Sequence, residues 1–489
     1  MSIAEARGRL LVLPFIVVAA MTVSASQETS STAKPRAGQL NVLLIVADDL
    51  NTRLGTYGYP VRSPHIDALA RRGVQFDRAY VQYSLCNPSR ASFLSGRRPA
   101  ATGIFNNNIA ARRAMPDAVF LPQYFRQHGY FTARVGKIFH VTKNYAINLD
   151  DALSWDETVN ERIPDQAELA SKLAGVRRVV KLPRHEPLEW APVTLSDNGL
   201  GDGYAADRAV EWLQRAGKGD RPFFLAVGFR RPHLPWEAPK KFFDMYRPDD
   251  MLLPDEPSDD TRDIPPVALT TQALDLVGAA DRRQAIAAYS ASTSYMDAQV
   301  GKVLSELDRL ALTDRTVVIF MGDHGYHLGE HGGMWEKQSL FEEGTHFPLV
   351  IAAPGGQRGV KTSRVVEALD VYPTVVELAG LPAREGLEGR SLTPLLNRPD
   401  APWDRPAVTE QVRQEANGGR LILGRTVRTE RWRYTEWDGG RLGAELYDHD
   451  ADRQEYHNLA KVPQHAETVQ RLKDLLRRVP ALETGKGGL

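Results

Sequence analysis

Four continuous apolar runs, rich in β-branched residues, occur along this chain of 489 residues. They cover residues 40–47, 222–229, 316–321 and 350–353. A run without polar alternation is typical of a strand whose sheet is covered by helices on both faces. The pattern therefore predicts a large central sheet that is buried on both sides.

Segments that we expect to be helices lie between these strands. They are residues 64–70, which begin with proline, residues 121–129, which end with glycine, and residues 202–213 and 285–310. Proline at the first turn and glycine after the last turn are common helix boundaries. Residues 150–200 are mixed in charge and rich in Pro and Arg, so we expect a loop excursion over the edge of the sheet.

The last part of the chain alternates polar and apolar residues at period two, which is typical of antiparallel strands. The strands are expected at residues 426–429, 432–437 and 444–448, and a final helix at 466–477. These elements predict a small α+β subdomain at residues 408–489, after a linker at 397–407 where prolines and aspartates cluster. The expected fold class is α/β, with a large mixed sheet flanked by helices at residues 39–396.

The first residues have the pattern of an export signal. Arg7 and Arg9 precede the apolar run 10–23, and Ala25 ends a small-residue cleavage site. We therefore expect a signal peptide at residues 1–25, followed by a disordered spacer at residues 26–38. A transmembrane anchor is the alternative, but the run is shorter than the ~20 apolar residues that a spanning helix needs. We expect no stable membrane anchor.

Composition narrows the compartment and the class of partner. Lys and Arg number 61, and so do Asp and Glu, so the net charge is zero and nothing favours nucleic acid as a partner. Cys86 is the only cysteine, so no disulfide forms within the chain. The only Asn-x-Ser/Thr sequence begins at Asn87 and contains proline, which excludes N-glycosylation there. With the export signal, these features predict a bacterial periplasmic or secreted protein.

Acidic residues directly follow two of the predicted strands. Asp48 and Asp49 come after the first strand, and Asp323 and His324 come shortly after the third. The carboxyl ends of the strands form the edge of an α/β sheet at which ligands bind. Adjacent carboxylates repel each other unless a cation lies between them, and hard oxygen donors suit Ca²⁺. For an isolated Asp-Asp pair, an ordinary turn is the alternative.

Cys86 lies in the sequence Cys86-Asn87-Pro88-Ser89-Arg90, outside any apolar run. A strand that leads into a helix start leaves unpaired N–H groups, which suit an anionic reaction centre, and Arg90 adds a permanent positive charge. The motif C-x-P-S-R resembles the signature of the sulfatase family, in which the cysteine is oxidised to formylglycine (3-oxoalanine). The alternative for a lone cysteine is a small buried apolar residue.

A second motif carries the same resemblance. Residues 129–140 run from Gly129-Tyr130 through Lys137 to an aromatic residue and His140. They are similar to the family's G-Y-x-T-x-x-x-G-K signature, in the form of its iduronate-2-sulfatase-like branch. The resemblance implies that Lys137 binds the sulfate and that His140 hydrogen-bonds the aldehyde hydrate. An exposed lysine and a loop histidine are the alternative.

The resemblance also implies the rest of the site and an alkaline-phosphatase-like fold. His233 lies in an x-x-P-H loop after the second predicted strand and would be the general acid. Lys337, after a loop rich in glycine and histidine, would be the second cation that binds sulfate. The family's metal ligands correspond to one Ca²⁺ bound by Asp48, Asp49, modified Cys86, Asp323 and His324.

These residues together predict an enzyme that removes sulfate from a sulfated saccharide. The predicted catalytic residues are Cys86, Arg90, Lys137, His140, His233 and Lys337. A formylglycine-generating enzyme would be the partner during maturation. Two alternatives remain: a phosphodiesterase or phosphonate monoester hydrolase of the same superfamily, and a non-catalytic protein that binds sulfated glycans with an unmodified Cys86.

Overall fold

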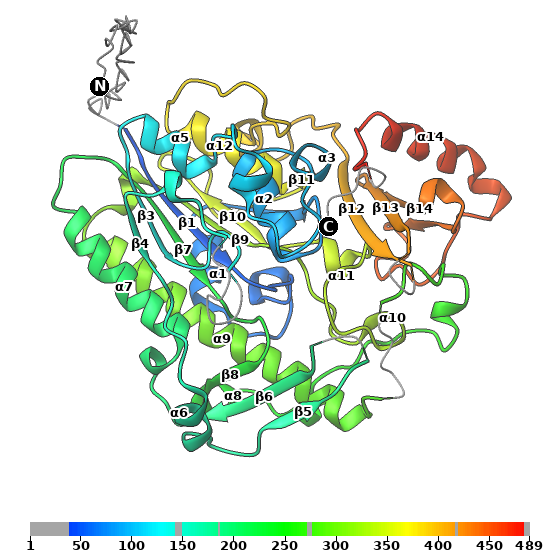
Figure 1. Ribbon diagram of the computed structural model, residues 1–489, viewed down its shortest axis with the longest axis horizontal. Helices are drawn as coiled ribbons and strands as arrows, with labels where there is room; N and C mark the ends of the chain where they lie inside the picture. Colours follow the sequence, from blue (N-terminus) through cyan, green and yellow to red (C-terminus); the bar gives the residue numbers. More distant parts are fainter. Residues whose placement is uncertain (1–38, 142–148, 184–185, 271–275, 416–418, 484–489) are drawn as a thin grey trace, which may run out of the picture. The chain divides into compact units, whose positions relative to one another are not determined.

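An eight-stranded mixed sheet forms the centre of the computed structural model (Figure 1). The spatial order is β11-β2-β10-β9-β1-β7-β3-β4, and only β10 runs against its neighbours. The strands are β1 Asn41–Ala47, β2 Val74–Tyr80, β3 Phe131–Gly136, β4 Glu157–Val159, β7 Phe223–Phe229, β9 Thr316–Gly322, β10 Leu349–Ala352 and β11 Val360–Glu367. This arrangement confirms the predicted α/β fold with a large mixed sheet.

The structure describes residues 39–141, 149–183, 186–270, 276–415 and 419–483. The predicted signal peptide and the predicted spacer lie outside these ranges. Within them, none of the helices is both long and apolar enough to cross a bilayer.

Helices cover both faces of the sheet, as the apolar runs predicted (Figure 1). Along β1, Val42, Leu44 and Val46 pack into one core and Leu43, Ile45 and Ala47 pack into the other. The first core also contains side chains of α2 Cys86–Ser95, α5 Leu121–Gln127 and α12 Val371–Leu378. The second contains side chains of α1 Pro64–Ala70, α7 Gly201–Ala216 and α9 Ala279–Arg309. A strand buried on both faces has no side chain that needs to be polar, which explains the continuous apolar run.

The prediction of a loop at residues 150–200 was wrong. This region contains β4 and α6 Gln166–Ser171, and it contributes two strands to a separate three-stranded sheet. The strands of that sheet are β5 Arg178–Val180, β6 Leu188–Val193 and β8 Trp236–Pro239. Because β6 pairs in parallel with β8, which lies more than forty residues later, its partner gives no local signal in the sequence.

The C-terminal part contains an antiparallel sheet, as predicted, but the sheet has four strands instead of the three expected, because β12 was missed. Its strands are β12 Ala407–Gln414, β13 Leu421–Arg428, β14 Trp432–Trp437 and β15 Ala444–Asp448, followed by α14 Ala466–Arg477. Leu472 and Leu476 of α14 pack with Val427 and Tyr434 of the sheet. The remaining helices are α3 Pro99–Thr102, α4 Ala111–Ala114, α8 Lys240–Phe243, α10 Glu330–Gly333, α11 Glu342–Thr345 and α13 Thr393–Asn397.

The segment expected to be a linker lies against β11. The Trp403 indole donates to the Val365 carbonyl at 2.8 Å, and Arg364 donates to the Ala401 carbonyl at 3.0 Å. The described residues on both sides of this segment belong to one compact unit. The division into a catalytic domain and a C-terminal subdomain at this point stays a prediction.

Candidate active site

Four adjacent parallel strands bring the predicted site residues to one edge of the sheet. The strands β3, β7, β1 and β9 lie side by side, so their carboxyl ends meet. Lys137 follows β3, His233 follows β7, Asp48 and Asp49 follow β1, and Asp323 and His324 follow β9. Chain segments that are up to about 275 residues apart in sequence therefore converge on one site, as shown by the bond from the Asp49 N–H to Asp323 Oδ1 at 3.0 Å.

Three carboxylates form the centre of this site. Asp48, Asp49 and Asp323 are fully buried, and one oxygen of each lies within 4.8 Å of the others. Burial of like charges at this distance is unfavourable unless cations compensate for them.

Arg90 supplies one of these cations and joins three strand ends. Its side chain is completely buried. It donates to Asp48 Oδ1 at 3.1 Å, to Asp323 Oδ2 at 2.9 Å, and to the carbonyls of Lys137 and Ile138 at 2.8 Å each. Because a guanidinium is a rigid fork, it fixes the relative position of these groups.

Two lysines provide the other positive charges. Lys137 Nζ lies 2.5 Å from Asp48 Oδ2, and Lys337 Nζ donates to both oxygens of Asp49 at 3.0 and 2.7 Å. Burial alone would raise the pKa of the Asp48 carboxyl. The charges of Lys137 and Arg90 outweigh it and hold that pKa well below its ordinary value.

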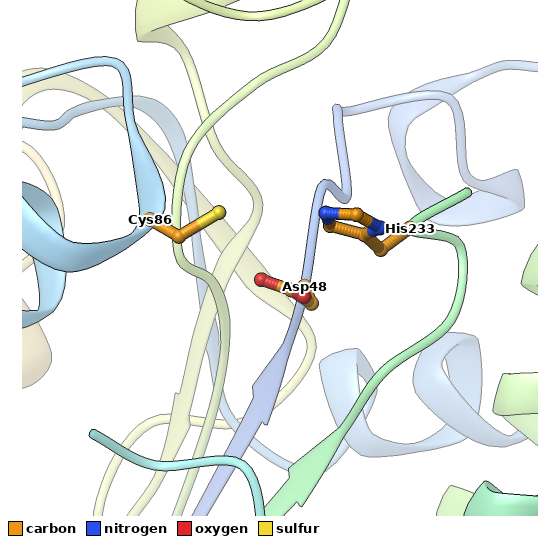
Figure 2. Close-up of side chains that lie close together, drawn as sticks. All are labelled: Asp48, Cys86 and His233. Carbon is orange, nitrogen blue, oxygen red and sulfur yellow. The ribbon is translucent and has the colours of Figure 1, made fainter. Parts of the chain in front are cut away.

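Cys86 is the first residue of α2, and its thiol faces the carboxylates (Figure 2). Its Sγ lies 3.3 Å from His324 Nε2 and 3.8 Å from Asp49 Oδ1. Burial raises the pKa of the Cys86 thiol well above its ordinary value, and the Asp48 carboxylate acts in the same direction. A thiol held neutral in this way is a poor nucleophile.

Two histidines and Lys137 line a cavity of about 300 Å³ next to this cluster. His233 Nε2 lies 3.4 Å from Lys337 Nζ and 3.8 Å from Asp49 Oδ2. Burial lowers the pKa of His233 to about 3, although the Asp49 carboxylate acts in the opposite direction. Burial also lowers the pKa of His140 to about 2, and its buried Nδ1 has no hydrogen-bond partner within the described part of the chain. Both imidazoles are therefore neutral at pH 7 when the cavity is empty.

Sequence reasoning missed the residue that supports Asp49. Asp49 has a φ of 59°, which is unfavourable for a residue other than glycine. The Tyr289 hydroxyl donates to the Asp49 carbonyl at 3.0 Å and accepts from the Asn51 N–H at 2.9 Å. Tyr289 lies on α9, and nothing in the pattern of that helix distinguishes it from an ordinary core residue.

The C-terminal sheet supports the segment that leads into Cys86, and sequence reasoning missed these contacts too. The Glu410 N–H on β12 donates to the Gln82 carbonyl at 2.9 Å, and Ser84 Oγ donates to Gln411 Oε1 at 3.0 Å. The Val412 N–H donates to the Tyr83 hydroxyl at 3.0 Å. The position of Cys86 therefore depends on residues more than 320 positions later in the chain.

The donor set suits a hard divalent cation. The three carboxylates supply the hard oxygen ligands that Ca²⁺ prefers, and His324 adds one nitrogen beside Cys86. Arg90, Lys137 and Lys337 already balance the three carboxylates. A bound divalent cation would therefore leave the site with a net positive charge, which suits an anionic ligand.

All the predicted site residues thus lie together at this edge of the sheet. Nine of them are joined by contacts of 3.8 Å or less, and His140 lines the adjacent cavity with Lys137 and His233. Their individual roles stay predictions, because proximity alone does not assign a role.

Comparison with known proteins gives consistent results. The family model described as Sulfatase matches residues 40–381, and the model described as N-sulphoglucosamine sulphohydrolase, C-terminal, matches residues 329–481. A sulfatase from Formosa agariphila is 31% identical, over 96% of this chain and 92% of its own length. Iduronate 2-sulfatase from Homo sapiens is 31% identical, over 95% of this chain and 98% of its own length.

Among solved structures, phosphonate monoester hydrolase from Silicibacter pomeroyi is similar, with a TM-score of 0.75. The two sequences are 24% identical, and the match covers 91% of this chain and 96% of that one. At this level of identity the similarity shows a shared fold.

Proposed function

This chain belongs to the sulfatase family, whose alkaline-phosphatase-like fold it shares, and it hydrolyses sulfate esters. From that premise we propose that its substrate is a sulfated saccharide, from which it removes sulfate. One observation carries the proposal. Side-chain atoms of Asp48, Asp49, His233 and His324 lie within 4.8 Å of Sγ of Cys86, and His233 also lines the adjacent cavity with His140 and Lys137.

The nucleophile in this proposal is formed by modification of Cys86. The thiol itself is buried, neutral and poorly nucleophilic, so its position is better explained by conversion to formylglycine. A formylglycine-generating enzyme would act on the motif around Cys86 during maturation. Once hydrated, the aldehyde presents two hydroxyls at the position that Sγ now occupies.

A divalent cation, which we propose to be Ca²⁺, would be held by Asp48, Asp49, Asp323, His324 and the modified Cys86. When bound, it would act as a Lewis acid toward an oxygen of the sulfuryl group. Arg90 keeps two of the carboxylates in place at this position, because its guanidinium joins Asp48 and Asp323.

The two lysines would bind the other sulfuryl oxygens. Their ammonium groups now lie on Asp48 and Asp49, two of the carboxylates proposed to hold the cation. As flexible point charges they can turn from a carboxylate to a substrate oxygen, which a rigid arginine fork cannot do as easily. Charge that develops on the sulfuryl group would be stabilised by groups that are already oriented.

The two histidines would move protons. His140, neutral because burial lowers its pKa, is in the form that a general base requires. His233 would protonate the departing sugar oxygen. It is neutral in the empty cavity, so we propose that the negative charge of a bound sulfate ester raises the pKa of this imidazole and makes protonation possible.

The saccharide leaving group is proposed from the relatives and from the cavity. The Homo sapiens relative is named for action on iduronate 2-sulfate, and it matches nearly the whole chain. The cavity beside His233 measures about 300 Å³, which is at the lower end of the range for small-molecule sites. Export to the periplasm or the medium, proposed from the sequence of the first residues, would bring the enzyme to such polysaccharides.

The experiment that tests this function compares the enzyme with a Cys86→Ser variant on 4-nitrophenyl sulfate. A serine keeps the shape of the site but offers one hydroxyl instead of two, so release of sulfate should fail after the first turnover. We expect turnover to fall by at least ~10³-fold, with unchanged folding by circular dichroism. Repeated turnover by Cys86→Ser would refute the mechanism.

A phosphonate monoester or phosphodiester substrate is the competing proposal, because all these esters present a tetrahedral anion. The similarity to the Silicibacter pomeroyi enzyme shows only the fold and does not favour it. Values of kcat/KM for nitrophenyl sulfate and for a nitrophenyl phosphonate ester separate the two. We expect the sulfate to be preferred.

A further inference from the structure

A second cavity, of about 600 Å³, lies apart from the predicted catalytic residues. Three parts of the chain form its wall. They are the loop after β1 with Arg53, Tyr57 and Tyr59, strands β2 and β11 with Arg78 and Lys361, and the C-terminal part with Arg428, His449 and Arg453. The loops that carry Asp49 and Lys337 also reach this wall, through Asn51 and Glu342.

Three cations on the wall lack a carboxylate partner among the described residues. Arg78 donates to the Ser363 carbonyl at 3.2 Å, and Lys361 donates to the Thr56 carbonyl at 2.6 Å. Arg453 is exposed and makes no ion pair in the described ranges. Neutral carbonyls leave the charge of these side chains uncompensated.

Three of the four carboxylates on the same wall, in contrast, are paired with a cation. Glu330 pairs with Arg53 at 2.6 Å, and Glu342 pairs with Arg433 at 2.5 Å and His346 at 3.1 Å. Glu343 lies 3.7 Å from His331, whereas Asp77 accepts only from the neutral Gln75 amide at 2.7 Å, so one uncompensated carboxylate stands against the three uncompensated cations. The charge that remains available to a ligand is therefore positive.

The wall also offers buried donors and an aromatic surface. The Arg428 side chain is 3% exposed, its Nε has no hydrogen-bond acceptor in the described ranges, and its ion pair with Glu342 is long at 3.6 Å. His346 Nε2 is likewise buried without a hydrogen-bond partner there. Tyr59 is 43% exposed, and the Arg53 guanidinium lies 5.7 Å from the centre of its ring.

We propose that this second cavity is a binding site for an anionic saccharide. The cations would bind its sulfate or carboxylate groups, and the face of Tyr59 would contact a sugar ring. The choice of a saccharide rests on the proposed function, whereas the preference for an anion rests on the wall itself. A ligand in this cavity would touch the loops that carry Asp49 and Lys337, so it would lie within reach of the active site without entering it.

The test measures binding of a fluorescently labelled heparin octasaccharide by anisotropy, in the Cys86→Ser background so that the probe stays intact. The variant combines Arg78→Ala, Lys361→Ala and Arg453→Ala. One control combines Arg113→Ala, Lys172→Ala and Arg471→Ala, which removes exposed cations elsewhere. A second control, Arg78→Lys with Lys361→Arg and Arg453→Lys, keeps the charge of the cavity.

We expect binding to be roughly tenfold weaker or more in the cavity variant and nearly unchanged in both controls. Equal loss in the cavity variant and the first control would overturn the proposal, since the attraction would then be non-specific. If inorganic sulfate displaces the probe at a concentration far below the chloride concentration needed for the same displacement, the cavity binds sulfate itself. That result would overturn the assignment to a saccharide. In the protein that keeps Cys86, the cavity variant and both controls should hydrolyse 4-nitrophenyl sulfate as fast as the unsubstituted protein does. If the unsubstituted protein itself does not hydrolyse this ester, the proposed function is wrong, but the binding result still stands.

Discussion

Two clusters of buried charge in this protein contain similar groups but differ in how their carboxylates are neutralised. In the cluster between α11 and the C-terminal sheet, Arg433 donates to Glu342 at 2.5 Å and also to Glu455, and His449 lies 2.7 Å from Glu455. In the active-site cluster, Lys137 and Lys337 lie on Asp48 and Asp49, next to a thiol and a cavity.

Both clusters place carboxylate and histidine atoms within 4.8 Å of one another, so proximity does not separate a structural cluster from a reactive one. The cations do. Arg433 is 1% exposed and its rigid fork pairs with both Glu342 and Glu455, and no lysine takes part in these pairs. In the proposed mechanism the lysines of the active site turn away from their carboxylates, and a divalent cation and an anionic ester take their places.

The largest effect that this comparison predicts is the loss of activity on metal removal. Dialysis against a chelator should lower kcat/KM on 4-nitrophenyl sulfate by ~10²-fold or more, because the sulfuryl oxygens would lose the proposed metal ion, which acts as a Lewis acid. Added Ca²⁺ should restore the activity. Full activity in protein shown by elemental analysis to be free of divalent metal would contradict the account of the carboxylate cluster.

The next largest effect should be on stability, at Arg433. Replacing it by alanine leaves the buried Glu455 and the partly buried Glu342 without their arginine, so we expect the free energy of unfolding to fall by about 3–5 kcal/mol. Arg364→Ala, which breaks a half-exposed pair with Glu430, should cost about 0–1 kcal/mol. Urea titrations measure both. The kcat of folded Arg433→Ala should stay near that of the parent, and a loss as deep as that of Cys86→Ser would mean that the C-terminal cluster is not merely structural.

A smaller and more specific effect is expected at Tyr289. Tyr289→Phe leaves the Asp49 carbonyl and the Asn51 N–H without their partner, so we expect Ca²⁺ affinity to fall by ~10-fold. Tyr295→Phe is the matched control on the same helix, because its hydroxyl also bridges two backbone groups, Asp197 O and Gly203 N, far from the carboxylates in sequence. Each change should cost about 1–3 kcal/mol of stability. Calorimetric titration with Ca²⁺ should show weaker binding in Tyr289→Phe than in Tyr295→Phe. Equal Ca²⁺ affinities of the two variants would show that Tyr289 does not position Asp49.

The prediction expected to affect activity least is a change in the pH dependence of stability, outside both clusters. Burial raises the pKa of Asp297 from 3.8 to about 7. In the unfolded chain the group ionises first, so its contribution to stability is fully present below about pH 4 and is lost as pH rises toward 7. In that window the loss approaches ~1.4 kcal/mol per pH unit. Asp297→Asn should remove this slope, and urea midpoints of both proteins between pH 4.5 and 7 measure it. Parallel pH profiles would contradict the raised pKa.

In the central sheet, the sequence predicted β1, β7, β9 and β10 from their apolar runs and missed β2, β3, β4 and β11, each of which contains at least one charged residue. The strands β1, β7 and β9 carry continuous apolar runs, and their ends carry Asp48, His233 and Asp323. Strand β2 was missed because its sequence includes Asp77 and Arg78, which face the second cavity and interrupt the apolar pattern.

In the site, too, some residues could be predicted from the sequence and others could not. Short motifs were sufficient to name the residues that meet around Cys86. The supporting contacts of Tyr289 and Gln411 could not be predicted, because they join positions 240 and 327 residues apart and involve ordinary residue types. Such contacts are set by packing, and no local pattern encodes them.

The central claim is that the strand ends position residue 86 as an aldehyde hydrate, not as a thiol. Peptide mass analysis of enzyme purified in active form, with a hydrazine reagent to label aldehydes, tests this most directly. The account predicts that the peptide containing residue 86 has lost its sulfur and reacts with hydrazine. A preparation that hydrolyses sulfate esters repeatedly while every copy of this peptide still carries a free thiol would contradict it.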